Sequence, residues 1–99
     1  MKKYKLFING RNFLMEVDGQ LERLGFYTTR YVEAENETEA EEAVVKLLRQ
    51  DKMLVEATLN KRDDPPMIYV EEICELESFE GCKVPGGGFA FYNNKGKTV

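Results

Sequence analysis

The sequence predicts an α+β domain in the order βββαββ, in which an antiparallel sheet of five to six strands is packed by one main helix on one face. Residues 36–52 place their apolar side chains at helical spacing. The segments before and after them alternate apolar and polar residues, as half-buried strands do. A single helix covers only one face of a sheet, so something else is expected to cover part of the other face.

The helix is expected within residues 36–52. Asn36 or Thr38 can cap its N-terminus, because either side-chain oxygen can accept a hydrogen bond from a backbone N–H, and a glutamate follows three residues after each. Glutamates crowd the first turn and basic residues the last turn, which suits the helix dipole. The apolar residues fall on one helical face: Ala40, Ala43, Val44, Leu47 and Leu48.

The N-terminal segment is expected to form a hairpin around Asn9-Gly10, because this pair suits the left-handed dihedrals of a type I′ turn. In that register six apolar residues share one face: Tyr4, Leu6, Ile8, Phe13, Met15 and Val17. Residues 18–24 should then be a loop with one helical turn at most. Residues 26–34, rich in Thr, Tyr, Phe and Val, should form the third strand.

Two further strands, 53–60 and 67–76, are expected after the helix, separated by a charged loop that ends in two prolines. The apolar alternation slips near Glu71-Glu72, which predicts a β-bulge there. Residues 88–92 can add a short last strand. Residues 1–92 would then form a single domain, and residues 93–99 a flexible C-terminal tail.

Composition excludes several classes of function. The 99 residues carry a net charge of −4, which argues against a nucleic-acid partner, since such proteins usually present a basic stripe. No apolar signal segment or membrane-length run is present, so a cytoplasmic protein without a membrane partner is expected. The chain has no histidine, which excludes His-based catalytic triads and His-metal sites. We therefore expect no metal and no cofactor, and no catalytic residue can be named.

The cysteines and the glycine run have structural interpretations. Cys74 and Cys82 are too far apart in sequence for a CxxC redox motif or a zinc knuckle, and we expect a buried Cys74, with both thiols reduced. The run 86–88 lacks the strand–turn–helix context of a dinucleotide-binding loop. It is interpreted as a hinge that lets Phe89 and Phe91 dock.

Two features point towards binding. Arg30 lies in the middle of a predicted strand, where a lone buried charge would be costly, so we expect it to pair with Glu72, with anion binding as the alternative. Aromatic residues also exceed what one small core needs: Tyr27, Tyr31, Tyr69, Phe89, Phe91 and Tyr92. On an uncovered sheet face such residues indicate self-association, and less often a ligand pocket.

The motif GFYTTRYVEA, the Ala/Glu-rich helix after it, and the later PPMIYVEEICEL and GFAFY resemble a group of small uncharacterised bacterial proteins of the kind found in mobile integron gene cassettes. The resemblance extends from residue 4 to residue 92. It implies a bacterial, cytoplasmic, compact α+β protein, and it carries no functional residues over to this chain.

Three hypotheses about function follow. The leading one is a non-enzymatic binding or interaction protein that forms a homodimer through the second sheet face, with an interface of Tyr27, Tyr31, Phe89 and Phe91. The alternative is a small-molecule-binding protein or enzyme with a pocket closed by the glycine run and lined by Tyr27, Arg30, Tyr31, Tyr69 and Glu72. The third is recognition of a basic partner protein by the acidic helix, as in an antitoxin or inhibitor.

Overall fold

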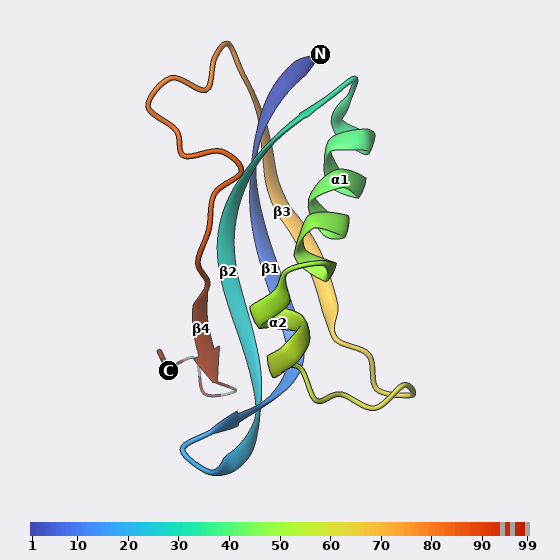
Figure 1. Ribbon diagram of the computed structural model, residues 1–99, viewed down its shortest axis with the longest axis vertical. Coiled ribbons are helices and arrows are strands. Elements are labelled where there is room, and N and C mark those ends of the chain that lie inside the picture. The colour runs from blue at the N-terminus through green and yellow to red at the C-terminus, as the bar shows by residue number, and fades with distance from the viewer. Residues whose placement is uncertain (94, 96, 99) are drawn as a thin grey trace.

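The computed structural model describes residues 1–93, 95, 97 and 98. Within them, four antiparallel strands form one sheet in the order β3-β1-β2-β4, and two helices cover one of its faces (Figure 1). The elements are β1 (Lys2–Val17), β2 (Gln20–Ala34), α1 (Glu37–Arg49), α2 (Lys52–Ala57), β3 (Met67–Leu76) and β4 (Ala90–Asn93). The α+β class and the antiparallel sheet are confirmed, whereas the expected five to six strands and single main helix are not. No helix of the described residues is long and apolar enough to cross a membrane.

The first hairpin differs from the prediction, because β1 is one continuous strand of 16 residues. Its turn lies at Asp18-Gly19, whose φ values of 50° and 81° suit a type I′ turn, and β2 begins directly afterwards at Gln20. A bulge between Gly10 and Phe13 shifts the side-chain alternation of β1 by one residue. The six apolar residues predicted to share a face therefore do share it, although the predicted turn is wrong.

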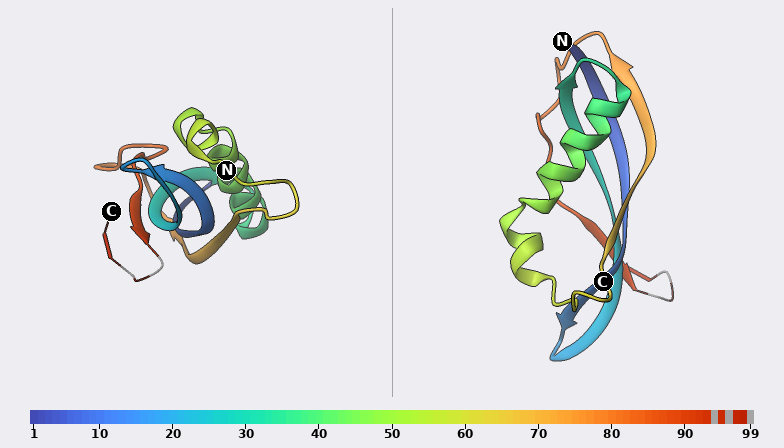
Figure 2. Two further views of the ribbon diagram at one scale, coloured as in Figure 1. Left: turned by 90° about the horizontal axis from the view of Figure 1, so that it is seen from below. Right: turned by 90° about the vertical axis from the view of Figure 1, so that its right-hand side faces the viewer.

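Helix α1 forms as predicted. Asn36 is its N-cap, and the side-chain Oδ1 of Asn36 accepts a hydrogen bond of 2.9 Å from the backbone N–H of Glu39. Ala40, Val44 and Leu48 are fully buried against the sheet. The long β1–β2 hairpin curves around the helices, so that the helices lie on its concave side (Figure 2).

Residues 53–60 do not form the predicted strand. Helix α2 occupies most of this segment, and its N-cap Asp51 accepts a hydrogen bond of 3.0 Å from the backbone N–H of Leu54. Only Leu54 of this helix is buried, while Met53 and Val55 point to solvent. The alternating apolar residues of this segment therefore do not line one face of a sheet.

The last two strands flank the hairpin. β3 pairs with β1, and the predicted bulge is confirmed, since Phe7 pairs with Glu72 and the next residue of β1 pairs with Val70. β4 pairs with residues 24–27 of β2. The predicted tail is partly structured, because Asn93 belongs to β4 and Thr98 forms a bridge with Tyr92. Positions 94, 96 and 99 of that tail lie outside the described residues.

Candidate functional site

The sheet has one face without helices (Figure 2). By the strand registers, this face holds most of the residues predicted to bind a partner. Its residues follow from the strand registers, because directly paired residues of neighbouring strands point to the same side. We call this surface the open face and define it by Lys3, Lys5, Phe7, Asn9, Arg11, Tyr27, Tyr31, Tyr69, Glu72, Cys74 and Tyr92.

Three aromatic side chains from three strands stack in a row on the open face. The rings of Phe7 and Tyr27 have centroids 5.3 Å apart and planes inclined by only 3°. The rings of Tyr27 and Tyr92 are also 5.3 Å apart, at 30°. Phe7 and Tyr27 remain 36% and 41% exposed. Because stacked neighbours cover part of the ring faces, this aromatic row presents mainly ring edges and the Tyr27 hydroxyl to a partner.

Asn9 lies beneath the aromatic row and is fully buried. Its Nδ2 donates to the Tyr92 hydroxyl at 2.7 Å and to the Phe26 carbonyl at 3.0 Å. Its Oδ1 accepts from Nε of Arg11 at 2.6 Å. The buried amide is therefore satisfied by hydrogen bonds, and it holds two side chains of the open face in place.

Gly25 makes room for the aromatic row. A Cβ atom at this position would lie 2.3 Å from Cζ of Tyr92, so only glycine lets that ring lie across β2. Gly10 plays the same part on the helix side, where a Cβ atom would lie 2.2 Å from Cε2 of Phe26.

Arg11 and Tyr69 extend the aromatic row towards β3. The Arg11 guanidinium carbon lies 5.2 Å from the centroid of the Tyr69 ring, within the range of a cation–π interaction. Nη2 of Arg11 is 3.9 Å from a carboxylate oxygen of Glu71, the bulged residue of β3. Tyr69 itself is 42% exposed. The bulge thus supplies a carboxylate that helps to orient a guanidinium on the open face.

Arg30 does not belong to this surface. It points to the helix side, is 3% exposed, and its Nη1 donates to the Thr28 hydroxyl, to the Thr29 carbonyl at 3.2 Å and to the Gly88 carbonyl at 3.3 Å. Burial lowers the pKa of Arg30, and the charge of Asp51 opposes that shift. Among the described residues no carboxylate lies within ion-pair distance of Arg30. The predicted pair of Arg30 with Glu72 is wrong, because Glu72 lies on the opposite face.

The other predicted site residues divide between the two faces. Tyr27, Tyr31, Tyr69 and Glu72 share the open face. Phe89 and Phe91 pack edge-on against Phe26 on the helix side, with ring centroids 4.9 and 5.8 Å from the Phe26 ring, which agrees with the docking expected of them after the glycine run. They therefore cannot share one interface patch with Tyr27 and Tyr31. Cys74 is exposed rather than buried.

Sequence analysis missed Phe7, Asn9 and Arg11. Phe7 could have been found, since it alternates with Leu6 and Ile8 and must point away from them. Asn9 and Arg11 were obscured by the expected turn at Asn9-Gly10. Their roles depend on Tyr92 and Tyr69, which are distant in sequence.

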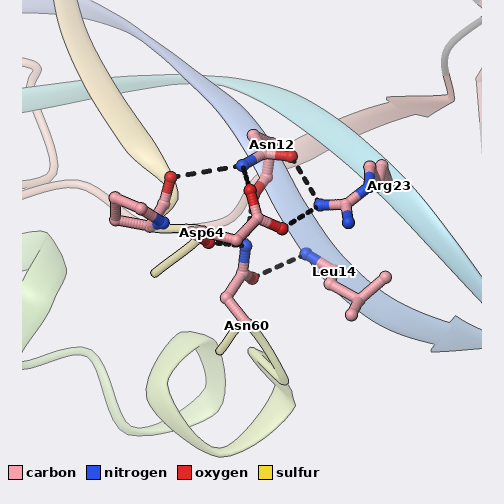
Figure 3. Close-up of polar contacts among 6 residues, drawn as sticks. Asn12, Leu14, Arg23, Asn60 and Asp64 are labelled. Carbon is pink, nitrogen blue, oxygen red and sulfur yellow. Dashed lines mark hydrogen bonds and ion pairs between the residues drawn. The ribbon is translucent and has the colours of Figure 1, made fainter. Parts of the chain in front are cut away.

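A cluster of polar side chains lies at the bulge of β1 between Gly10 and Phe13, apart from the open face (Figure 3). The side chain of Asp64 accepts hydrogen bonds from Asn12 Nδ2 at 2.9 Å and from Arg23 Nη1 at 2.6 Å. The hydrogen bond from Asn12, followed by that from Arg23, holds the pKa of Asp64 below its usual value. These groups satisfy one another, so the cluster anchors the loop before β3. Among residues 1–93, 95, 97 and 98, no group of three potential metal ligands is found.

No family model, curated protein or solved structure matches this chain.

Proposed function

We propose that this chain is a non-enzymatic interaction protein that forms a homodimer through its open face. The proposal rests on the exposed aromatic row of Phe7, Tyr27 and Tyr92, which Tyr69 and Arg11 extend. Tyrosine and arginine are enriched among the residues that dominate protein–protein binding energy. The assignment to a bacterial, cytoplasmic protein of the integron-cassette kind is part of the same proposal and is supported by the sequence motifs.

The aromatic row and Arg11 are already held in place before a partner binds. Asn9 holds both Tyr92 and Arg11 by hydrogen bonds, and Tyr27 is stacked between two rings. Ordering a flexible side chain at an interface costs about 0.5–1.5 kcal/mol. A surface whose side chains are already ordered avoids most of that cost, which favours a binding role over a merely solvated sheet face.

The size of the open face places a dimer among the small interfaces, which are typical of weak association. β3, the shortest of the three strands that carry most of the surface, has 10 residues. With about 3.4 Å per residue and about 4.8 Å between strands, the shared area is roughly 34 by 14 Å, or about 500 Å² per copy. Two copies would bury about 1,000 Å² in projection, near the lower limit for a specific interface. We therefore expect a dimer that dissociates in the micromolar range.

Charge on the open face is mixed in sign. Lys3 of β1 lies directly opposite Glu33 of β2 in the strand register, and the Arg11 guanidinium lies beside the Glu71 carboxylate. Two such faces do not repel each other strongly, although the whole chain is acidic. A nucleic-acid partner fits less well, because the rings stack on one another and offer few open faces for bases.

The test is sedimentation velocity from low to high micromolar concentration. The wild type should shift from monomer to dimer, and Tyr27→Lys should weaken the dimer at least tenfold, because a hot-spot loss is about 2 kcal/mol or more. Met53→Lys is the matched control, since Met53 is 48% exposed on α2, away from the open face. A wild type that stays monomeric at high micromolar concentration, or an equal effect of the control, refutes the proposal.

The pocket lined by Tyr27, Arg30, Tyr31, Tyr69 and Glu72 receives no support from the geometry. Arg30 lies on the helix side of the sheet, and the other four lie on the open face.

A further inference from the structure

A pocket opens on the helix side of the sheet, at the junction between α1 and α2 and beside the start of β3. Its volume is about 240 Å³. Its floor is formed by three side chains of the buried core, each no more than 3% exposed: Phe13, Leu48 and Leu54. We call this hollow the junction pocket, and its walls come from Arg49, Val55, Thr58, Pro66 and Ile68. The pocket thus reaches from the surface down to the core.

The interior of the junction pocket is mainly apolar. Only two of the eight residues that line it are polar, Arg49 and Thr58. The Thr58 hydroxyl donates a hydrogen bond of 2.6 Å to the Leu54 carbonyl, so its proton is already used. The volume lies below the range of about 300–1,000 Å³ that is typical of ligand pockets, which favours a small molecule over a helix or loop of a partner protein.

Arg49 supplies the charge at the rim of the junction pocket. It stands one position after the buried Leu48 and four positions after Val45, which packs against the core, so its side chain leaves the flank of α1 that faces β3. Among the described residues, no carboxylate lies within ion-pair distance of Arg49, and no acidic residue lines the pocket. Lys46 precedes Arg49 by one helical turn, whereas Glu42, the nearest acidic residue before it along α1, is two turns or about 10 Å away.

The acceptor groups at the junction have partners within the protein. Three carbonyls of the last turn of α1 accept hydrogen bonds of 3.1–3.3 Å from the backbone N–H groups of Gln50 and Asp51. The Asp51 carboxylate caps α2, where it accepts a hydrogen bond of 3.0 Å from the backbone N–H of Leu54, and its charge acts on the buried Arg30. Arg49 is therefore a cation at the mouth of an apolar pocket for which these groups supply no counter-ion.

We propose that the junction pocket binds a small molecule with an apolar body and one carboxylate, such as an aliphatic acid. The apolar body covers the floor of the pocket, and burial of its surface drives binding. The carboxylate stays at the exposed rim and accepts hydrogen bonds from the Arg49 guanidinium, whose planar fork matches its geometry. An amine of the same shape would meet a like charge there. The pocket lies on the helix side of the sheet, so a dimer formed through the open face leaves it accessible.

The test compares two probes with the same alkyl chain and opposite charge, octanoate and octylammonium. Each is titrated at neutral pH, below the concentration at which it forms micelles, into the full chain labelled with ¹⁵N, and amide shifts report the site and the affinity. Octanoate should shift the amides of Arg49, Leu54 and Ile68 and leave that of Tyr27 unchanged. It should bind more tightly than octylammonium, although the net charge of −4 attracts the cation to the chain as a whole.

Arg49→Gln should weaken octanoate roughly two- to fivefold, the range of an exposed ion pair, and should not weaken octylammonium. Lys5→Gln, which removes the same charge from the open face, is the control and should leave both affinities unchanged. Val55→Asp, at a position that is 54% exposed, puts a carboxylate beside the pocket and should reverse the preference between the two probes. The proposal is overturned if octanoate does not bind, if its shifts lie outside the pocket, if octylammonium binds equally well or better, or if Arg49→Gln and Lys5→Gln behave alike.

Discussion

Replacing Asn60 by alanine should destabilise the fold, because the Asn60 side chain is hydrogen-bonded to the backbone of β1 at its bulge (Figure 3). The Asn60 Nδ2 donates to the carbonyls of Asn12 at 2.7 Å and Asp64 at 2.9 Å, and its Oδ1 accepts from the Leu14 N–H at 2.8 Å. Each such bond contributes about 0.5–1.5 kcal/mol net, and water replaces part of the loss at this half-buried site. We expect a loss of about 2–3 kcal/mol in the free energy of unfolding, or about 10–20 °C in Tm.

Two measurements test this expectation together. Urea unfolding gives the change in free energy, and native-state hydrogen exchange gives the protection of the Leu14 amide, which loses its acceptor in Asn60→Ala. Lys61→Ala, an exposed change at the next position, is the control and should stay within about 0.5 kcal/mol of the wild type. A loss below about 0.5 kcal/mol in Asn60→Ala, or an unchanged exchange rate at Leu14, would refute the reasoning.

Two further predictions concern the aromatic row and the polar cluster. Gly25→Ala should push the Tyr92 ring off β2 and lower the free energy of unfolding by about 1–3 kcal/mol in a urea titration, whereas Gly87→Ala, with open space around its Cβ position, should have little effect. Because the pKa of Asp64 is lowered in the fold, its ionised form stabilises the protein above the ordinary carboxyl pKa, and this stabilisation is lost as the pH falls through the folded pKa. Unfolding titrations at a series of acidic pH values should show a weaker pH dependence in Asp64→Asn than in the wild type, and equal slopes would contradict the role given to Asn12 and Arg23.

The turn predicted at Asn9-Gly10 is wrong because the apolar alternation of residues 4–17 fits two different backbone structures. A two-residue turn and a single bulge both shift the apolar alternation by one position, so both place Leu6 and Met15 on one face. The pair Asn9-Gly10 favoured the turn. In the structure these two residues serve contacts with distant parts of the chain: the Asn9 side chain donates a hydrogen bond to the Tyr92 hydroxyl, and Gly10 leaves room for the Phe26 ring. The composition of the face was predictable, but the path of the chain was not.

The segment after α1 was ambiguous for a different reason. A short apolar run does not distinguish a strand from a helix by its period alone. The decisive residue is Asp51, whose side chain caps α2. Asp51 stands just before a run that alternates cleanly, from Met53 to Leu59, and the alternation outweighed the capping signal. A cap followed by only six helical residues is too short a signal to override the strand pattern.

The alternation of β2 also limits which of its residues can act together. Arg30 is adjacent to Tyr31 in sequence, and neighbouring side chains of a strand point to opposite faces. A pocket containing both was therefore in conflict with the predicted strand itself. In the structure Arg30 is held by Thr28 and the Gly88 carbonyl on the helix side, while Tyr31 lies half-buried on the open face, with its ring edge-on to that of Phe79. The alternation of β2 thus assigns its arginine to the interior beneath the helices and its tyrosines to the open face, and no single pocket can contain both.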